Sequence, residues 1–262
     1  MTKPDKELSV SVVIPTYNEQ ETIMAVVLQV LTLPCVSEVI IVDDCSTDNT
    51  FKIASELAAQ RPNVTLLRQP VNGGKTKAVK AGFARTTGDI VIVQDADLEY
   101  DPAEIPAVIE PIQLGLADVV FGSRFLVRRA ARVLYFYHFL ANRALTFLSN
   151  ALTNINLTDV ETGYKAFRGD IIRNMIITSE GFGFEIEVTA KVARLNARIY
   201  EVPISYHGRT YQEGKKIGFK DGIAAIWYIL RFNLFCSMQS SFQRMPAACS
   251  SSGACWPQSA SR

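Results

Sequence analysis

Short apolar runs alternate with amphipathic stretches over the first half of the chain, a pattern typical of alternating strands and helices. The apolar runs predict strands over Val10–Ile14, Glu38–Val42, Val64–Leu67, Ile90–Val93 and Val119–Phe121. The stretches between them predict helices over residues 21–31, 49–60, 75–85 and 102–114. Repeated strand–helix units favour parallel strands joined by right-handed crossovers. The pattern therefore predicts an α/β fold with a doubly wound, mostly parallel sheet flanked by helices.

Beyond Arg124 the pattern changes to longer apolar and aromatic stretches. The first runs from Val133 to about Leu152, and we interpret it either as a buried core helix or as a helix lying in the plane of a membrane surface. The second, Gly222–Phe235, is too short for a bilayer, which needs about 20 residues. We expect residues 221–236 to form an amphipathic helix suited to a membrane interface, and the Ser-rich residues 237–262 to be a disordered tail.

Composition narrows the class of protein further. A chain of 262 residues with 48% hydrophobic residues can bury one large core. Its formal net charge of +1 argues against a nucleic-acid-binding protein, which normally carries a basic excess. Five cysteines without metal-type spacing favour free thiols in a reducing compartment.

The strand at Ile90–Val93 runs into Asp95 and Asp97, two carboxylates separated by one small residue. Side chains at i and i+2 of an extended chain point to the same side. Open α/β sheets bind ligands at the carboxyl ends of their strands. Asp95 and Asp97 can therefore share a Mg²⁺ or Mn²⁺ ion that also binds phosphate oxygens. The alternative is a strand-end turn with two solvated aspartates.

Polar residues also follow the first two strands. Tyr17 offers a ring for a nucleobase, and the carboxylates of Glu19 and Asp44 can accept hydrogen bonds from ribose or base. The loop Asn72–Lys75 contains two glycines that permit close backbone approach, and Lys75 can face a diphosphate. This loop lacks the spacing of a Walker phosphate loop, which argues against an ATPase or kinase.

In chain order, the segments VVIPTYNE, VDDCSTDNT, NGGKTKAVKAGF and VQDADLEYDP resemble family 2 glycosyltransferases of the GT-A type. The resemblance continues through GSR, TDVETGYKAFR, GFGFEIEVTAKVAR and EVPISYHGRTYQEGKKIGFKDG, and covers about residues 9–235. The second half looks most like dolichyl- and polyprenyl-phosphate mannose synthases. The resemblance implies a catalytic GT-A domain over residues 1–220. It also implies inverting transfer of a hexose from GDP-mannose or UDP-glucose to a polyprenyl or dolichyl phosphate.

The same resemblance assigns roles to residues on the donor side. The nucleotide-sugar site maps to Pro15, Tyr17, Glu19, Asp44 and Asp95, and we add Lys75 from the glycine loop. The ligands of Mg²⁺ or Mn²⁺ map to Asp95, Asp97 and Glu99, and mannose synthases often have glutamine at the position of Glu99. The metal neutralises charge on the leaving diphosphate, so Asp97 counts among the catalytic residues.

An ionised lipid phosphate is already a nucleophile, so the acceptor side requires cations rather than a strong base. Our candidates for holding this phosphate are Arg124, Arg143, Arg209 and Lys215. Arg124 follows a strand end and is also placed among the catalytic residues, with Asp159. Asp159 and Glu161 can contact hydroxyls of acceptor or sugar, or act as a base for a hydroxyl acceptor. For Glu185, helix-dipole stabilisation and sugar-hydroxyl binding are both open.

Two other functions remain as alternatives. One is a glycosyltransferase that acts on a saccharide hydroxyl, although the chain lacks the Gln-x-x-Arg-Trp motif usual in processive synthases. The other is a non-catalytic protein that binds nucleotide sugars, which the presence of both Asp95 and Asp97 disfavours. A dinucleotide-dependent dehydrogenase is not supported, since no Gly-x-Gly-x-x-Gly follows the first strand. For the leading function we expect a protein at the cytoplasmic face of a membrane, in contact with its surface.

Overall fold

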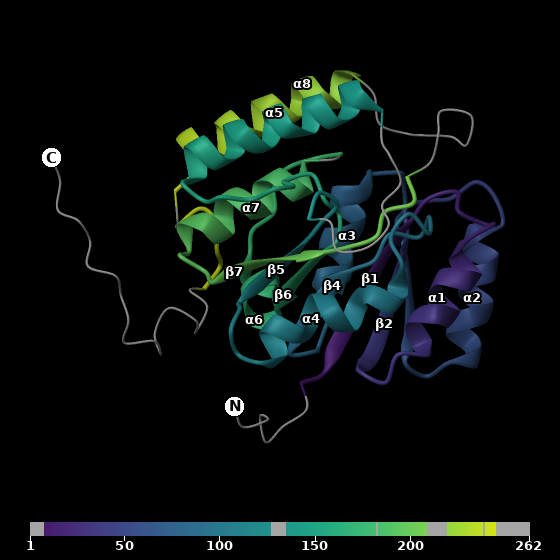
Figure 1. Ribbon diagram of the computed structural model, residues 1–262. Helices are drawn as coiled ribbons and strands as arrows, with labels where there is room; N and C mark the ends of the chain where they lie inside the picture. Colours follow the sequence, from purple (N-terminus) through teal and green to yellow (C-terminus); the bar gives the residue numbers. More distant parts are fainter. Residues whose placement is uncertain (1–7, 127–134, 182, 209–218, 238, 245–262) are drawn as a thin grey trace, which may run out of the picture.

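The structure is a computed structural model that describes residues 8–126, 135–181, 183–208, 219–237 and 239–244. Within these residues the strands form one seven-stranded sheet in the order β3-β2-β1-β4-β6-β5-β7. Figure 1 shows this sheet from β2 to β7, with helices on either side. The strands are β1 (Val10–Thr16), β2 (Val36–Asp43), β3 (Val64–Arg68), β4 (Ile90–Val93), β5 (Val119–Ser123), β6 (Lys165–Arg168) and β7 (Ile199–Pro203).

The sheet is mostly parallel, as predicted. β1 pairs in parallel with β2 and β4, β2 with β3, and β5 with β7. β6 is the exception and runs antiparallel between β4 and β5. The apolar pattern identified β1 to β5, whereas β6 and β7 were not anticipated. The inserted β6 brings the chain back across the sheet, and its preceding loop therefore lies near the ends of β4 and β5.

Helices cover both faces of the sheet. The helices α1 (Ile23–Leu31), α2 (Thr50–Gln60) and α4 (Ile105–Gln113, after a 3₁₀ turn at Pro102–Glu104) pack on the face to which Val12 and Ile14 point. On the face of Val13 lie α3 (Lys75–Phe83), α6 (Gly169–Asn174) and α7 (Phe184–Arg194). Every residue of β1 is buried, as expected for a strand with apolar packing on both sides.

Two further helices, α5 (Phe136–Thr153) and α8 (Phe219–Leu234), form an outer layer on α7 (Figure 1). Ile186 of α7 packs with Ala225 and Ile229 of α8, and the leucines on the inner side of α5 pack against them. The opposite side of this pair is apolar and exposed, since Phe147 is 75% and Trp227 57% exposed. α5 is therefore not a fully buried helix, and its exposed side carries apolar side chains. Among the described helices, none combines the length and apolar character needed to cross a bilayer.

The chain after α8 departs from the expected boundary of the disordered tail at residue 237. Ser241 and Phe242 are buried, and Phe242 bridges to Met175. Backbone hydrogen bonds from Ile176 to Ser241 and from Gln243 to Asn174 fix this segment beside α6. A Ser-rich composition did not reveal the single phenylalanine that packs into the core. Residues 245–262 lie outside the described part of the chain.

Candidate functional site

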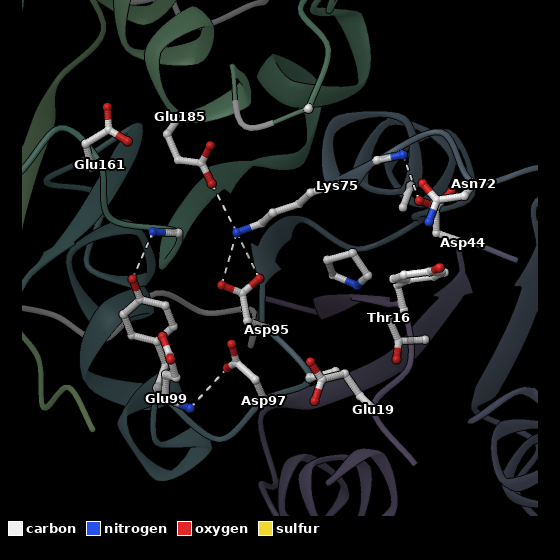
Figure 2. A pocket seen from close by; sticks show the side chains of 18 of the residues that line it. Thr16, Glu19, Asp44, Asn72, Lys75, Asp95, Asp97, Glu99, Glu161 and Glu185 are labelled. Carbon is white, nitrogen blue, oxygen red and sulfur yellow. Dashed lines mark hydrogen bonds and ion pairs between the residues drawn. The ribbon is translucent and has the colours of Figure 1, made fainter. Parts of the chain in front are cut away.

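A cavity of about 290 Å³ opens where β1, β2 and β4 end. Figure 2 shows its acidic side chains around Lys75, with Thr16, Asp44 and Asn72 at one end and Glu161 and Glu185 at the other. All the residues expected to bind the nucleotide sugar or the metal line this cavity together: Pro15, Tyr17, Glu19, Asp44, Lys75, Asp95, Asp97 and Glu99. Arg124, expected on the acceptor side, lines the same cavity.

Each of the three strand-end turns at the cavity contains a non-glycine residue in the left-handed region. Their φ angles are 54° at Asn18, 62° at Cys45 and 61° at Leu98. This region is uncommon for non-glycine residues and especially so for leucine. Backbone strain of this kind persists where the surrounding structure fixes it, and it concentrates at functional sites. Leu98 lies between Asp97 and Glu99, so the strained turn sets the direction of both acidic side chains.

Asp44 organises the glycine loop that enters α3. Its two carboxylate oxygens accept the backbone N–H groups of Gly73 and Gly74 at 2.9 and 2.7 Å. Gly74 has a φ of 81°, a conformation in which a side chain is strained. The carboxylate therefore holds the loop that carries Lys75, in addition to forming part of the cavity wall.

Lys75 is the central cation of the cavity (Figure 2). Its Nζ lies 2.9 and 3.0 Å from the two oxygens of Asp95 and 3.0 Å from Oε1 of Glu185. Burial by itself lowers the pKa of Lys75, but the charges of Asp95 and Glu185 outweigh it and raise the pKa well above its usual value. Lys75 is therefore charged and links the strand-end carboxylate to α7.

The turn after β4 orients Asp97 and Glu99 differently. Oδ1 of Asp97 accepts the backbone N–H of Glu99 at 3.1 Å, whereas Oε2 of Glu99 accepts the hydroxyl of Tyr206 at 2.8 Å. Among the described residues, no three histidine, cysteine, aspartate or glutamate side chains converge as a metal site. The expected three-carboxylate set of Asp95, Asp97 and Glu99 is therefore not assembled, because Tyr206 holds Glu99 to the segment after β7.

Arg124 is fixed at the cavity by Asp159. Its Nε and Nη2 donate to the two oxygens of Asp159 at 2.6 and 2.7 Å, and Asn142 of α5 donates to the same carboxylate at 3.2 Å. Asp159 has no exposed surface; burial raises its pKa, but Arg124 outweighs this and keeps the pKa below its usual value. Asp159 does not line the cavity. In this arrangement it positions Arg124, and the expectation of a base at Asp159 does not fit its contacts.

Of the other three candidate phosphate ligands, the structure describes Arg143 alone. Arg143 is exposed on α5 and does not line the cavity, while the neighbouring Asn142 faces Asp159. The helix directs Asn142 rather than Arg143 toward Asp159, and binding of the acceptor phosphate by Arg143 stays a prediction. Arg209 and Lys215 lie outside the described residues.

Several cavity residues were not identified from the sequence. The Cζ atom of Arg124 lies 5.0 Å from the centroid of the Tyr206 ring. Tyr100 stacks against Tyr164, with ring centroids 5.3 Å apart. Burial raises the pKa of Tyr100 to about 12, so its hydroxyl stays protonated. Thr16, within the PTYNE segment, has a buried hydroxyl on the cavity wall. Aromatic and hydroxyl side chains of this kind lack a spacing pattern by which a sequence could reveal them.

The sheet with its inserted antiparallel strand, and the acidic cavity at the strand ends, define a glycosyltransferase with a GT-A-like fold. The chain belongs to glycosyl transferase family 2, whose family model matches residues 11–176. The resemblance predicted from its motifs is confirmed.

Within this family, the chain is similar to curated mannosyltransferases of lipid phosphates. The chain is 32% identical to the undecaprenyl-phosphate mannosyltransferase of Micrococcus luteus over 87% of this chain and 99% of that protein. It is also 32% identical to the dolichol-phosphate mannosyltransferase of Pyrococcus furiosus, over 80% of this chain and 60% of the relative. The mannose synthase resemblance thus extends over most of the chain.

Solved structures show the same fold. The glucosyl-3-phosphoglycerate synthase of Mycobacterium tuberculosis, in complex with Mn²⁺, UDP and glucosyl-3-phosphoglycerate, superposes with a TM-score of 0.67. The two chains are 23% identical, over 86% of this chain and 80% of the other. At this identity the likeness establishes the fold.

Proposed function

We propose that the protein transfers a hexose, with inversion, from a nucleoside-diphosphate sugar to a polyprenyl phosphate. The observation that carries the proposal is the combination of Asp95 and Asp97 with Arg124 in one cavity. The carboxylates suit a cation that binds the donor diphosphate, and the fixed guanidinium suits the phosphate of the acceptor. The printed names of the relatives, mannosyltransferases of undecaprenyl and dolichol phosphate, support this acceptor class.

The donor set fits a divalent cation, either Mg²⁺ or Mn²⁺. Lys75 contacts both oxygens of Asp95, so a divalent ion at Asp95 would share this carboxylate with the ammonium group or displace it. Mg²⁺ is commonly held by one or two carboxylates together with substrate phosphates, and Asp95 and Asp97 supply that number. When bound, the ion stabilises negative charge on the leaving diphosphate. The Mn²⁺ and UDP in the complex of the M. tuberculosis enzyme support this assignment.

The acceptor side is built to hold an anion. Asp159 supports Arg124 from behind through two short hydrogen bonds, and the Tyr206 ring lies under the guanidinium. In the proposed reaction an oxygen of the lipid phosphate forms a bond to the anomeric carbon of the sugar. The bond from that carbon to the diphosphate breaks, and the nucleoside diphosphate leaves with the electron pair. Arg124 holds the attacking phosphate and offsets its charge.

Transfer to a saccharide hydroxyl is the second candidate, because the cavity contains one carboxylate suited to remove a proton. Burial, and then the charge of Glu185, raise the pKa of Glu161 to about 7. A general base works best near the ambient pH. Both oxygens of Asp159 bind Arg124, so we assign the general base of such a reaction to Glu161.

The outer side of α5 and α8 supports contact with a lipid surface. Exposed aromatic and aliphatic side chains on it include Phe136, Tyr137, Phe147, Ile226 and Trp227. Trp and Tyr are favoured at membrane interfaces. The inner side of α5 carries Asn142, which donates a hydrogen bond to Asp159, the partner of Arg124. The cytoplasmic face of the membrane remains our prediction for the location.

The test supplies purified protein with Mn²⁺ or Mg²⁺, a short polyprenyl phosphate, and GDP-mannose or UDP-glucose in separate reactions. Mass spectrometry of the organic phase should detect a hexosyl lipid phosphate that disappears with EDTA. Asp97→Asn should lower the rate by about a thousandfold, as expected when transition-state charge loses its stabilisation. The exposed Asp101→Asn, in the same turn, should leave it unchanged.

Release of nucleoside diphosphate with a saccharide acceptor, but without glycosylated lipid, would favour the second candidate. Turnover by the Asp97→Asn protein at the wild-type rate would contradict the metal assignment.

A further inference from the structure

Glu185 presents a buried carboxylate oxygen to the cavity. The side chain begins α7 and is 4% exposed, and its Oε1 is held by Lys75 at 3.0 Å. The other oxygen, Oε2, is buried and accepts no hydrogen bond from any described residue. A buried carboxylate oxygen without a donor is costly, so such an atom indicates a missing ligand.

Glu161 provides a second oxygen of the same kind. Its Oε1 is also buried and has no hydrogen-bond donor within the described part of the chain. Both carboxylates line the cavity. After burial, the negative charge of Glu185 is the largest contribution that raises the pKa of Glu161. Two carboxylates from different segments, each with one buried oxygen that lacks a donor among the described residues, therefore line the same cavity.

This region adjoins the end of the cavity assigned to the diphosphate. Lys75 connects Glu185 to Asp95 directly. A Cβ atom added at Gly163, two residues after Glu161, would lie 2.8 Å from Oδ2 of Asp95 and 2.9 Å from Nζ of Lys75. The loop of Glu161 thus packs closely on the Asp95–Lys75 pair. Figure 2 shows Asp44 and Thr16 at the opposite end.

A ligand that satisfies both oxygens must donate two hydrogen bonds beside a diphosphate. A hexose of a nucleotide sugar does so, because its ring hydroxyls donate and it is joined directly to the diphosphate. We propose that Glu161 and Glu185 each accept a hydrogen bond from a hydroxyl of the transferred hexose and thereby select the donor sugar. This inference rests on the proposed function, since it assumes that a nucleotide sugar is the donor.

The experiment compares two ligands that differ only in the sugar. Isothermal titration calorimetry with Mn²⁺ measures Kd for GDP-mannose against GDP, and for UDP-glucose against UDP. Glu161→Ala should weaken binding of the preferred sugar nucleotide about tenfold or more, as expected on losing a hydrogen bond to a charged group. Binding of the nucleoside diphosphate should change less than twofold. Glu161→Gln, which keeps an acceptor oxygen, should restore part of the loss.

Glu110→Gln, an exposed residue on α4, is the matched control for the loss of one negative charge. Glu185→Gln should also reduce the sugar-dependent part of the affinity, and circular dichroism checks that each variant is folded. Sugar nucleotides that lack one hydroxyl identify which hydroxyl contacts Glu161. The deoxy sugar that lacks this hydroxyl should bind the wild-type protein as weakly as the intact sugar nucleotide binds Glu161→Ala. Its binding to Glu161→Ala should be no weaker than that.

The outcomes separate this inference from the proposed function. Equal loss of affinity for nucleotide and nucleotide sugar, or no loss for either, would overturn the sugar-binding role of Glu161 and Glu185. If the wild-type protein binds neither nucleotide sugar, the proposed function itself fails, together with the inference that depends on it.

Discussion

At the scale of single residues, Arg124 and Asp159 form a pair whose geometry depends on the planar guanidinium. Two parallel hydrogen bonds of 2.6 and 2.7 Å hold Arg124 against a carboxylate with no exposed surface. Lysine keeps the charge but cannot form this pair of bonds. Removing the charge altogether would leave Asp159 buried and unpaired, which destabilises a fold by about 3–5 kcal/mol.

We therefore predict that Arg124→Lys raises the KM for the lipid phosphate about tenfold or more and leaves the Kd for the nucleoside diphosphate within twofold. Steady-state kinetics with varied acceptor, together with calorimetry of nucleotide binding, measure the two effects. Arg61→Lys, at an exposed position after α2, controls for the exchange itself. An unchanged KM for the acceptor would remove Arg124 from the phosphate site.

Glu161 makes stability depend on pH in a defined window. Its usual pKa is 4.5, and burial followed by the charge of Glu185 raises the pKa to about 7 in the folded protein. The folded state therefore retains the proton more strongly than the unfolded state. The stabilisation by this proton is complete below about pH 4.5 and is lost as pH rises to about 7.

Glu161→Gln resembles the protonated side chain at every pH. We predict that the variant gains stability relative to wild type between pH 4.5 and 7, by at most about 3 kcal/mol, because one pKa unit corresponds to about 1.4 kcal/mol. Urea unfolding at several pH values, without metal or nucleotide, measures the difference. A difference that stays constant across this window would show that Glu161 has an ordinary pKa.

Among the elements, α5 has two sides with different contacts. Asn142 and Thr146 point toward the Asp159 segment, and the leucines on the inner side pack with α8. Phe136 and Phe147 stay exposed on the other side. α5 therefore has an inner side that contacts α8 and the Asp159 segment, and an outer side that is apolar and exposed.

We predict that the double change Phe147→Ser and Trp227→Ser lowers partitioning onto anionic phospholipid vesicles by about tenfold or more, since each buried aromatic side chain contributes about 1.5–3 kcal/mol. Co-sedimentation measures the partitioning. Met24→Ser, at a position of α1 that is 44% exposed, is the control on another helix. Equal vesicle binding by the double variant and the wild type would exclude this side as the membrane contact.

At the scale of the whole molecule, the cavity joins parts of the chain that are far apart in sequence. Lys75 from α3, Asp95 after β4 and Glu185 of α7 form one ion-pair network. A ligand that binds this network in the folded state alone stabilises the whole fold by mass action. The stabilisation depends on both the cation and the nucleotide.

Mn²⁺ and a nucleoside diphosphate together should therefore raise the Tm more than the sum of their separate effects. At a hundred times Kd the gain is about 2.7 kcal/mol, which corresponds to a shift of a few degrees. Thermal denaturation followed by circular dichroism measures the shift, and Asp97→Asn should remove the synergy. Strictly additive shifts would argue that cation and nucleotide occupy separate sites.

Apolar periodicity was enough to predict the alternation of β1 to β5 with α1 to α4, because it reflects burial directly. It also placed Asp95, Asp97 and Asp44 at strand ends, and parallel strands end at one edge of a sheet. It did not reveal β6, four residues whose first member is the fully buried Lys165, since a lysine in a strand reads as a solvent-facing position.

The contacts between side chains of distant segments became known from the folded chain. Asp159 binds Arg124 across 35 positions, Tyr206 holds Glu99 across 107, and Asn142 rather than Arg143 faces the site. The burial of Phe242, which lies in a Ser-rich segment, was likewise not predictable from the sequence pattern. Periodicity determines which face of an element is buried, but a contact between distant segments depends on how the elements pack, and no local pattern encodes that packing.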